Sequence, residues 1–288
     1  MSLPFHIVDV FAERKYAGNQ LAVVLDADCL TGDEMHKITQ EFGYSETSFV
    51  LSQEAVDGGY PVRIFTPGSE IPFAGHPTLG TAAVIREELL SPVAGDVALD
   101  VAAGLIPVTF GDVLWMRQRP PELGDILDSS LAARTIGLEA ADIGAGHPVQ
   151  VVSTGLPAII IPLKNLEALK RCRLDRERYR ELADAAGSTN LYIFCPEPHE
   201  SENDLAARMF ADDLGVPEDP ATGSAAGCLA AYLAEHRYLG DGPVDVRLEQ
   251  GYEIGRPSLL YLRAEKSPEG IAVEVGGKVQ MVARGELL

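Results

Sequence analysis

The sequence predicts an α+β protein of two pseudo-symmetric domains, each a mixed β-sheet wrapped around a central α-helix. The chain has 288 residues, which suits two medium-sized domains. Strand-like and helix-like patterns recur in the same order in both halves, at an offset of roughly 143 to 148 residues, and a period this long indicates duplication of a whole domain. In each half, a glycine also precedes a helix of small residues.

The first half begins with β-rich runs and a well-marked helix. Thr31, with Glu34 three residues later, forms a capping-box pattern, and Gly43 is the expected end of that helix. The predicted elements are strands at 4–12 and 20–25, a helix at 31–43, strands at 46–52 and 60–66, a helix at about 76–90, and strands at 96–104, 105–111 and 113–118.

The second half follows a Pro-rich segment at 117–124, which predicts a linker and then a short helical or irregular connector. The predicted elements are strands at 148–153 and 158–162, a helix at 175–187, strands at 190–195 and 205–211, a loop and helix at 219–237, and strands at 243–250, 258–264, 271–277 and 279–285. We therefore expect domains at 1–118 and 125–288, with the last one or two strands free to return to the first domain.

Charge and hydropathy exclude several classes of partner. The formal net charge is −20, and Lys and Arg form no concentrated stripe, which disfavours nucleic acid and anionic lipid as partners. No run of about 18 apolar residues and no signal-peptide pattern occurs, so we expect a cytoplasmic protein without membrane contact.

Cysteines and glycine loops give no sign of a metal or a cofactor. Cys29, Cys172, Cys195 and Cys228 are widely spaced without a CxxC pair, which argues against a zinc site and a disulfide framework. Neither a GxGxxG nor a GxxxxGK[ST] loop is present. We expect chemistry without a cofactor.

The two small-residue helices begin in comparable ways. Aligning Gly75 with Gly223 sets "EIPFAGHPTLGTAAV" against "DPATGSAAGCLAAYL" and places His76 opposite Ser224. A lone Gly-His-Pro is more often an ordinary helix start. The recurrence in a duplicated chain instead favours two helix N-termini that face a shared cleft and bind a carboxylate through free N–H groups.

One acidic residue breaks the internal repeat. Glu46 begins an apolar strand, whereas Thr189 or Asn190 occupies the corresponding place in the second half. Glu46 is flanked by Tyr44 and Phe49, and loss of water raises a carboxyl pKa toward the range useful for proton transfer. The alternative is an exposed glutamate at a strand entrance.

Six blocks in order resemble the phenazine-biosynthesis PhzF-like isomerase family. They are "AGN" near residue 18, "YSETSFV" at 44, "RIFTPGSEIPFAGHPTLGTA" at 63, "STGLPAIIIPL" at 153, "EDPATGSAAG" at 218 and "QGYEIGRPS" at 250. The resemblance implies the fold of diaminopimelate epimerase, with two pseudo-symmetric domains and the active site in the cleft between them.

The resemblance also implies roles for individual residues. The glutamate of "SET" is the general acid/base of such isomerases, the "GHP" histidine and the "EDPATGSA" aspartate assist it, and other motif residues bind substrate. Here these positions are Glu46, His76 and Asp219 as catalytic residues, and Asn19, Gly75, Gly223 and Ser224 as substrate-binding residues. A small-molecule carboxylate substrate, no metal or cofactor, and a possible homodimer are further implications.

The residue types favour one function over two alternatives. A single glutamate can move a proton between two carbons, whereas inversion at one carbon usually needs two opposed groups. Related epimerases place a cysteine before each loop glycine, where this chain has Ala74 and Thr222. We expect an isomerase acting on a dihydro-hydroxyanthranilate-like compound; an amino-acid racemase or epimerase and a non-catalytic small-acid-binding protein are the alternatives.

Overall fold

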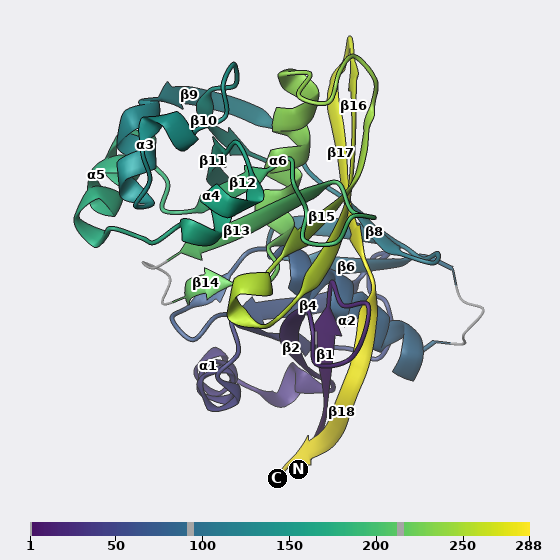
Figure 1. Cartoon of the computed structure of the whole chain (residues 1–288). Helices are drawn as coiled ribbons and strands as arrows, with labels where there is room; N and C mark the ends of the chain where they lie inside the picture. Colours follow the sequence, from purple (N-terminus) through teal and green to yellow (C-terminus); the bar gives the residue numbers. More distant parts are fainter. Residues whose placement is uncertain (1, 91–94, 212–215) are drawn as a thin grey trace. The chain divides into compact units, whose positions relative to one another are not determined.

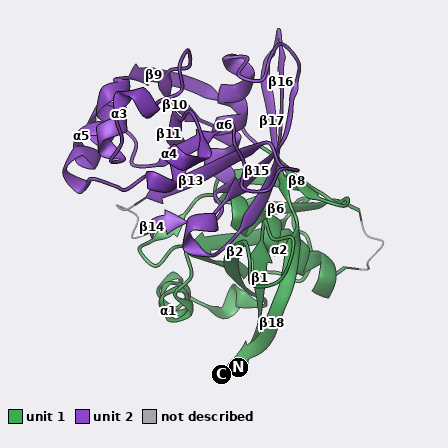
Figure 2. Cartoon of the chain, in the orientation of Figure 1, with its two compact units in different colours: residues 1–117, 276–288 green, residues 118–275 purple. Residues whose placement is uncertain are grey.

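The chain has a mixed α+β fold. The computed structural model describes residues 2–90, 95–211 and 216–288. It divides into two compact units, unit 1 with residues 1–117 and 276–288 and unit 2 with residues 118–275 (Figures 1 and 2).

Unit 1 contains most of the first half of the chain and the C-terminal strand. Its elements are β1 (Leu3–Val10), β2 (Asn19–Val24), the 3-10 helix η1 (Ala27–Cys29), α1 (Gly32–Phe42), β3 (Glu46–Val50), β4 (Tyr60–Phe65), β5 (Glu70–Ile71), α2 (Gly75–Glu88), β6 (Val97–Val101), β7 (Gly104–Thr109), β8 (Leu114–Arg117) and β18 (Val279–Leu287).

Helix α2 is the central helix of unit 1. It contacts β1, β2, β3, β6, β7, β8 and β18. Its small residues permit this close packing: a Cβ added at Gly80 would lie 2.6 Å from Leu21 Cδ2 and 2.8 Å from Val10 Cγ2. Separately, α1 contributes Met35 to an apolar cluster with Phe49 of β3 and other buried residues.

Helix α1 forms as its sequence predicts. The Thr31 hydroxyl accepts from the Glu34 N–H, and the Glu34 carboxylate accepts from the Thr31 N–H at 2.8 Å. The helix ends at Gly43, whose φ of 68° is left-handed and suits glycine. The predicted capping box is therefore confirmed.

Unit 2 contains the remaining elements. They are β9 (Glu122–Leu127), α3 (Ser129–Thr135), η2 (Ala140–Asp142), β10 (Val149–Ser153), β11 (Pro157–Pro162), α4 (Leu166–Arg171), α5 (Arg176–Ala186), β12 (Leu191–Cys195), β13 (Leu205–Ala211), β14 (Val216–Asp219), α6 (Gly223–Glu235), β15 (Val244–Gln250), η4 (Tyr252–Ile254) and β16 (Ser258–Ser267); β17 (Gly270–Gly277) runs from unit 2 into unit 1.

Helix α6 has the position in unit 2 that α2 has in unit 1. It contacts β10, β11, β15 and β16, and nearly all its residues are buried. A second apolar cluster joins α3, α4 and α5 to strands of the sheet, through buried residues such as Leu169, Tyr179, Ile159 and Ile193. Unit 2 therefore has its own core.

Strand pairing repeats in the same order within each unit. In unit 1, β1–β2, β3–β4 and β6–β7 are antiparallel, and β2–β3 and β4–β6 are parallel. In unit 2, β10–β11, β12–β13 and β15–β16 are antiparallel, and β11–β12 and β13–β15 are parallel. The strand pairing within each unit is therefore mixed, with both parallel and antiparallel pairs.

Two segments differ from the sequence-based expectation. Residues 122–127, expected within a linker and connector, form β9, which pairs with β10 from Leu127↔Val149 to Glu122↔Ser153. Helix α4 was also not predicted, because it is too short to show a helical period, whereas α3 lies in the segment expected to be a short helical or irregular connector. The last strand, β18, pairs with β1 in unit 1.

Candidate functional site

Three polar side chains expected to bind or react with substrate come together in unit 1. Asn19 begins β2 and Glu46 begins the neighbouring parallel strand β3, while His76 lies in the first turn of α2. His76 Nε2 is 3.4 Å from Glu46 Oε2, and His76 Nδ1 is 3.2 Å from Asn19 Nδ2. The His76 side chain is 5% exposed and that of Glu46 17%, so little water reaches the pair.

Burial sets the charge of the histidine. Desolvation lowers the pKa of His76 to about 3, against a smaller opposing effect of a hydrogen bond with the Gln20 backbone. The imidazole is therefore neutral near pH 7. It therefore lies beside the Glu46 carboxyl without adding a positive charge there.

The buried histidine should make the protein sensitive to acid. Because the pKa of His76 is lower in the folded chain than its unfolded value near 6.5, the unfolded chain takes up the proton first as pH falls. Its contribution to the free energy of unfolding is complete above pH 6.5 and is lost toward pH 3, by about 1.4 kcal/mol per pH unit within that window. Urea unfolding between pH 4 and 8 measures this slope.

His76→Asn provides the comparison, because carboxylates and other histidines also titrate in acid. The difference in unfolding free energy between wild type and His76→Asn should shrink steadily below pH 6.5. A difference that stays constant down to pH 4 would show that His76 is not buried in the neutral form.

The two central helices differ from the other helices in how they begin. Neither Ala74 before α2 nor Thr222 before α6 makes a side-chain cap to its helix. The other four α-helices of the described chain are capped by the side chains of Thr31, Asp128, Asn165 and Asp175. The first-turn N–H groups of α2 and α6 thus lack the side-chain acceptor that the other helices have, as an anion site requires.

The remaining expected residues lie together in unit 2. Asp219 is the last residue of β14, and its Oδ2 accepts a hydrogen bond from the hydroxyl of Thr222. Gly223 and Ser224, both buried, open α6 directly afterwards. Gln250, to which the sequence assigned no role, contacts the same loop; it lies in the quoted "QGYEIGRPS" block, and that was the available signal.

The place of Glu46 in unit 2 is taken by an amide. Helices α1 and α5 both end at left-handed glycines, Gly43 and Gly187, and the third residue after each is Glu46 or Asn190. Asn190 is buried and donates to the Pro157 carbonyl at 3.0 Å. Of these two equivalent positions, only Glu46 carries a carboxyl group.

The thiols offer no activated nucleophile in the interior. Cys172, Cys195 and Cys228 are buried, and desolvation raises the pKa of the first two to about 12 and that of Cys228 to about 11. Within the described ranges, no group of three or more His, Cys, Asp or Glu could hold a metal ion. No helix of the described chain is long and apolar enough to cross a membrane.

Thiol labelling should reflect this burial. In the folded protein, iodoacetamide at pH 8 should modify Cys29, which is exposed, and leave the three buried thiols intact, because the thiolate is the reacting form. Mass spectrometry of the native and urea-unfolded protein measures this, with all four sites reacting after unfolding. Rapid labelling of Cys228 in the native protein would contradict its raised pKa.

Comparison with known proteins agrees with these features. The family model for phenazine biosynthesis-like proteins (PhzC-PhzF) matches residues 8–285. The trans-2,3-dihydro-3-hydroxyanthranilate isomerase of Pseudomonas aeruginosa is 35% identical, over 97% of each chain. The crystal structure of a phenazine biosynthesis protein of the PhzF family from Bacillus anthracis superposes with a TM-score of 0.90 at 30% identity, covering 100% of this chain and 99% of that one.

A more distant likeness bears on the fold alone. A hydroxyproline epimerase from Agrobacterium vitis matches with a TM-score of 0.58 at 11% identity, over 99% of this chain and 92% of that one. The family model and the 35% identical relative both span nearly the whole chain. The chain is therefore an isomerase and belongs to the PhzC-PhzF phenazine biosynthesis-like family.

Proposed function

We propose that the chain moves a proton between two carbons of a small, unsaturated, carboxylate-bearing substrate of the dihydro-hydroxyanthranilate type, with Glu46 as the only acid/base. The main support for this proposal is the largely buried Glu46 carboxyl, which lies 3.4 Å from the His76 imidazole, and burial keeps that imidazole neutral. The 35% identical relative from P. aeruginosa is a trans-2,3-dihydro-3-hydroxyanthranilate isomerase, which supports the substrate class.

The chemistry needs one group that works twice. Glu46 takes a proton from one carbon, the electron pair of that C–H bond moves through the unsaturated system, and the same proton returns to another carbon. A single carboxyl group reaches one face of the substrate, so the proton leaves and returns on that face. His76 orients the carboxyl group, and Asn19 in turn contacts the other ring nitrogen of His76. Substrate and product differ only in the position of one hydrogen and of the double bonds.

Substrate binding is assigned to the two helix starts. Gly75 in α2, and Gly223 with Ser224 in α6, present N–H groups to the substrate carboxylate and to negative charge that develops during transfer. Asp219 binds an amine or hydroxyl group of the substrate. The repeated pairing order of the strands supports two pseudo-symmetric domains of the diaminopimelate epimerase type.

Racemisation is the weaker candidate. A two-base inversion needs a second proton carrier, and the position equivalent to Glu46 holds Asn190, which cannot carry one. Ala74 and Thr222 stand where a thiol-based epimerase of this fold would have cysteines. Neither an amide nor these side chains can replace the missing base.

Isotope transfer tests the proposal directly. Wild-type protein is incubated in ordinary water with trans-2,3-dihydro-3-hydroxyanthranilate deuterated at the carbon that loses its hydrogen. We expect isomerised product with part of the deuterium at the receiving carbon, because one monoprotic acid carries the label across. Proton NMR and mass spectrometry locate the label.

The same experiment separates the alternatives. A racemase would leave the double bonds of the substrate in place and invert one stereocentre, and the deuterium at that carbon would exchange with water. A non-catalytic binder would return the substrate unchanged at enzyme concentrations that saturate it. Either result, reproduced over a panel of related unsaturated amino acids and hydroxy acids, would overturn the proposed isomerisation.

A further inference from the structure

The segment after β15 holds the Asp219 loop in place. Gln250, the last residue of β15, hydrogen-bonds to Asp219 and Thr222, which are about thirty residues earlier in the chain and flank the start of α6. Gln250 as a whole is 1% exposed. A buried amide must satisfy its donors and acceptors within the protein, and Gln250 uses both ends on or beside this loop.

The orientation of the Gln250 amide follows from its backbone partners. Its Oε1 accepts from the Thr222 N–H at 3.2 Å, and its Nε2 donates to the Asp219 carbonyl at 2.8 Å. Because a backbone N–H can only donate and a carbonyl can only accept, the reversed amide would lose both bonds. The amide therefore has one possible orientation.

Tyr192 supports this arrangement from β12. Its hydroxyl donates to Gln250 Oε1 at 2.9 Å. Burial, with a smaller contribution from the charge of Asp219, raises the pKa of Tyr192 well above its ordinary value. The hydroxyl therefore remains protonated and available as a donor.

The consequence falls on the Thr222 hydroxyl. Threonine before a helix usually caps it by accepting from a first-turn N–H. Here Oγ1 accepts instead from Gln250 Nε2 at 3.1 Å, donates to the Asp219 carboxylate, and makes no cap to α6. Gln250 thus helps keep the hydroxyl away from the helix start.

Neighbouring residues hold the middle of the loop. The Ser258 hydroxyl donates to the Pro220 carbonyl at 2.9 Å. Gly251 has a φ of +78°, and a Cβ there would lie 2.6 Å from the Pro220 oxygen. The end of β15 therefore approaches the loop as closely as its backbone permits.

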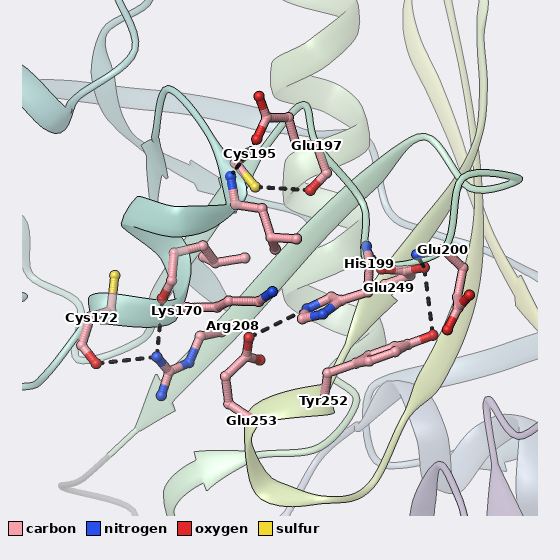
Figure 3. A network of polar contacts seen from close by, with 12 residues as sticks. Lys170, Cys172, Cys195, Glu197, His199, Glu200, Arg208, Glu249, Tyr252 and Glu253 are labelled. Atoms are coloured by element: carbon pink, nitrogen blue, oxygen red, sulfur yellow. Dashed lines mark hydrogen bonds and ion pairs between the residues drawn. The ribbon is translucent and has the colours of Figure 1, made fainter.

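Glu249, the preceding residue of β15, holds a different loop. Its carboxylate accepts from the Glu200 N–H at 2.9 Å and from the His199 N–H, and it lies near the Tyr252 hydroxyl (Figure 3). It also accepts from the Asn203 side-chain amide at 2.6 Å. Side chains of successive strand residues point to opposite faces, which explains the division. Glu249 is a matched control for Gln250 because both are buried polar residues of one strand.

We propose that Gln250 is a positioning residue, which holds Thr222 and Asp219 so that the first turn of α6 stays uncapped and can bind the substrate carboxylate. This inference rests on the proposed function in assigning that turn to substrate binding. Gln250 acts only through the loop and is given no contact with substrate.

Carboxylate affinity at α6 tests the inference without requiring turnover. Anthranilate is titrated into ¹⁵N-labelled protein, and the amide shifts of Gly223, Ser224 and Ala225 are followed. Gln250→Met keeps the side-chain volume but removes its hydrogen bonds, which frees the Thr222 hydroxyl to cap α6. We expect wild type to bind and Gln250→Met to bind roughly tenfold more weakly, the equivalent of one net hydrogen bond.

A double variant identifies the cause. Valine at position 222 has no hydroxyl with which to cap α6, so Gln250→Met should have little further effect in a Thr222→Val background, with dissociation constants within about twofold. Hydrogen exchange of the Ser224 and Ala225 amides, measured without ligand, should slow in Gln250→Met alone. A loss of affinity of the same size in both backgrounds would overturn the inference.

Two further variants guard against a trivial loss of folding. If Gln250→Met does not fold, Tyr192→Phe replaces it in the test. This variant removes one hydrogen bond to Gln250 and should weaken anthranilate binding about two- to threefold. Glu249→Gln should lower stability and leave the dissociation constant unchanged. The inference would be overturned if Glu249→Gln weakened anthranilate binding as much as Gln250→Met, or if the α6 amides of wild type did not respond to anthranilate. If wild type bound anthranilate but did not catalyse the isomerisation, only the proposed function would be rejected.

Discussion

Replacing Glu46 with glutamine is expected to slow the isomerisation by about 100- to 10,000-fold, the usual contribution of a general acid/base. The amide keeps the size of the side chain and can still face His76, 3.4 Å away in wild type, but it cannot carry a proton. The measurement is the rate at which trans-2,3-dihydro-3-hydroxyanthranilate is converted in heavy water, together with deuterium incorporation at the receiving carbon.

Two controls separate lost chemistry from lost structure. Glu46→Asp keeps an acid but draws it back by one methylene, so we expect an intermediate loss of rate, since transfer depends on the distance between carboxyl and carbon. Glu41→Gln removes an exposed carboxylate from the preceding helix and should not change the rate. If Glu46→Gln incorporated deuterium as fast as wild type, Glu46 would not be the shuttle.

The duplicated order of elements was predictable because its signals are local. A capping box at Thr31 and Glu34, a left-handed glycine at Gly43 and alternating apolar residues each act over a few residues. The two glycine-led helices could be aligned for the same reason. Local rules of this kind predicted the identity of the two central helices but not their contacts.

Contacts between distant segments could not be predicted. Nothing in the sequence pairs Gln250 with Thr222, because that contact depends on the parallel pairing of β13 with β15 and on the end of β15 reaching Pro220. The strand at 122–127 was not predicted for a related reason. Five of its six residues are exposed, so β9 lacks the buried alternation that identifies a strand and forms by pairing with β10.

The state of the site also depends on burial that the sequence does not show. "GHP" indicates a histidine at a helix start, yet its neutral form follows from desolvation inside unit 1, which lowers the pKa of His76 to about 3. Glu46 was predicted as a candidate acid/base because it breaks the internal repeat, and the structure adds that its carboxyl group lies close to the His76 ring. The proposed proton transfer at this site therefore depends on both the residue type and its packing.

The second large effect is expected at Asp219, the last residue of β14 in unit 2. Asp219→Asn should lower kcat/KM about 10- to 100-fold, because a hydrogen bond or ion pair from the substrate to a charged group contributes roughly 1.5 to 3 kcal/mol. The asparagine oxygen can still accept from the Thr222 hydroxyl, so the loop should keep its conformation and the free energy of unfolding should change little. Steady-state kinetics and urea unfolding of the same sample measure both quantities.

A substitution of Glu218, the residue before Asp219 in β14, should have the opposite effects on stability and on kcat/KM. Its carboxylate binds the Arg208 guanidinium through two bonds of 2.9 and 2.8 Å, and their side chains are 10% and 5% exposed. Glu218→Gln leaves a buried Arg208 without its counter-charge, so it should lower the free energy of unfolding by about 3 to 5 kcal/mol while kcat/KM stays near that of wild type below the unfolding transition. If the two variants instead lowered kcat/KM equally, Asp219 would act by supporting β14, and its assignment to substrate binding would be wrong.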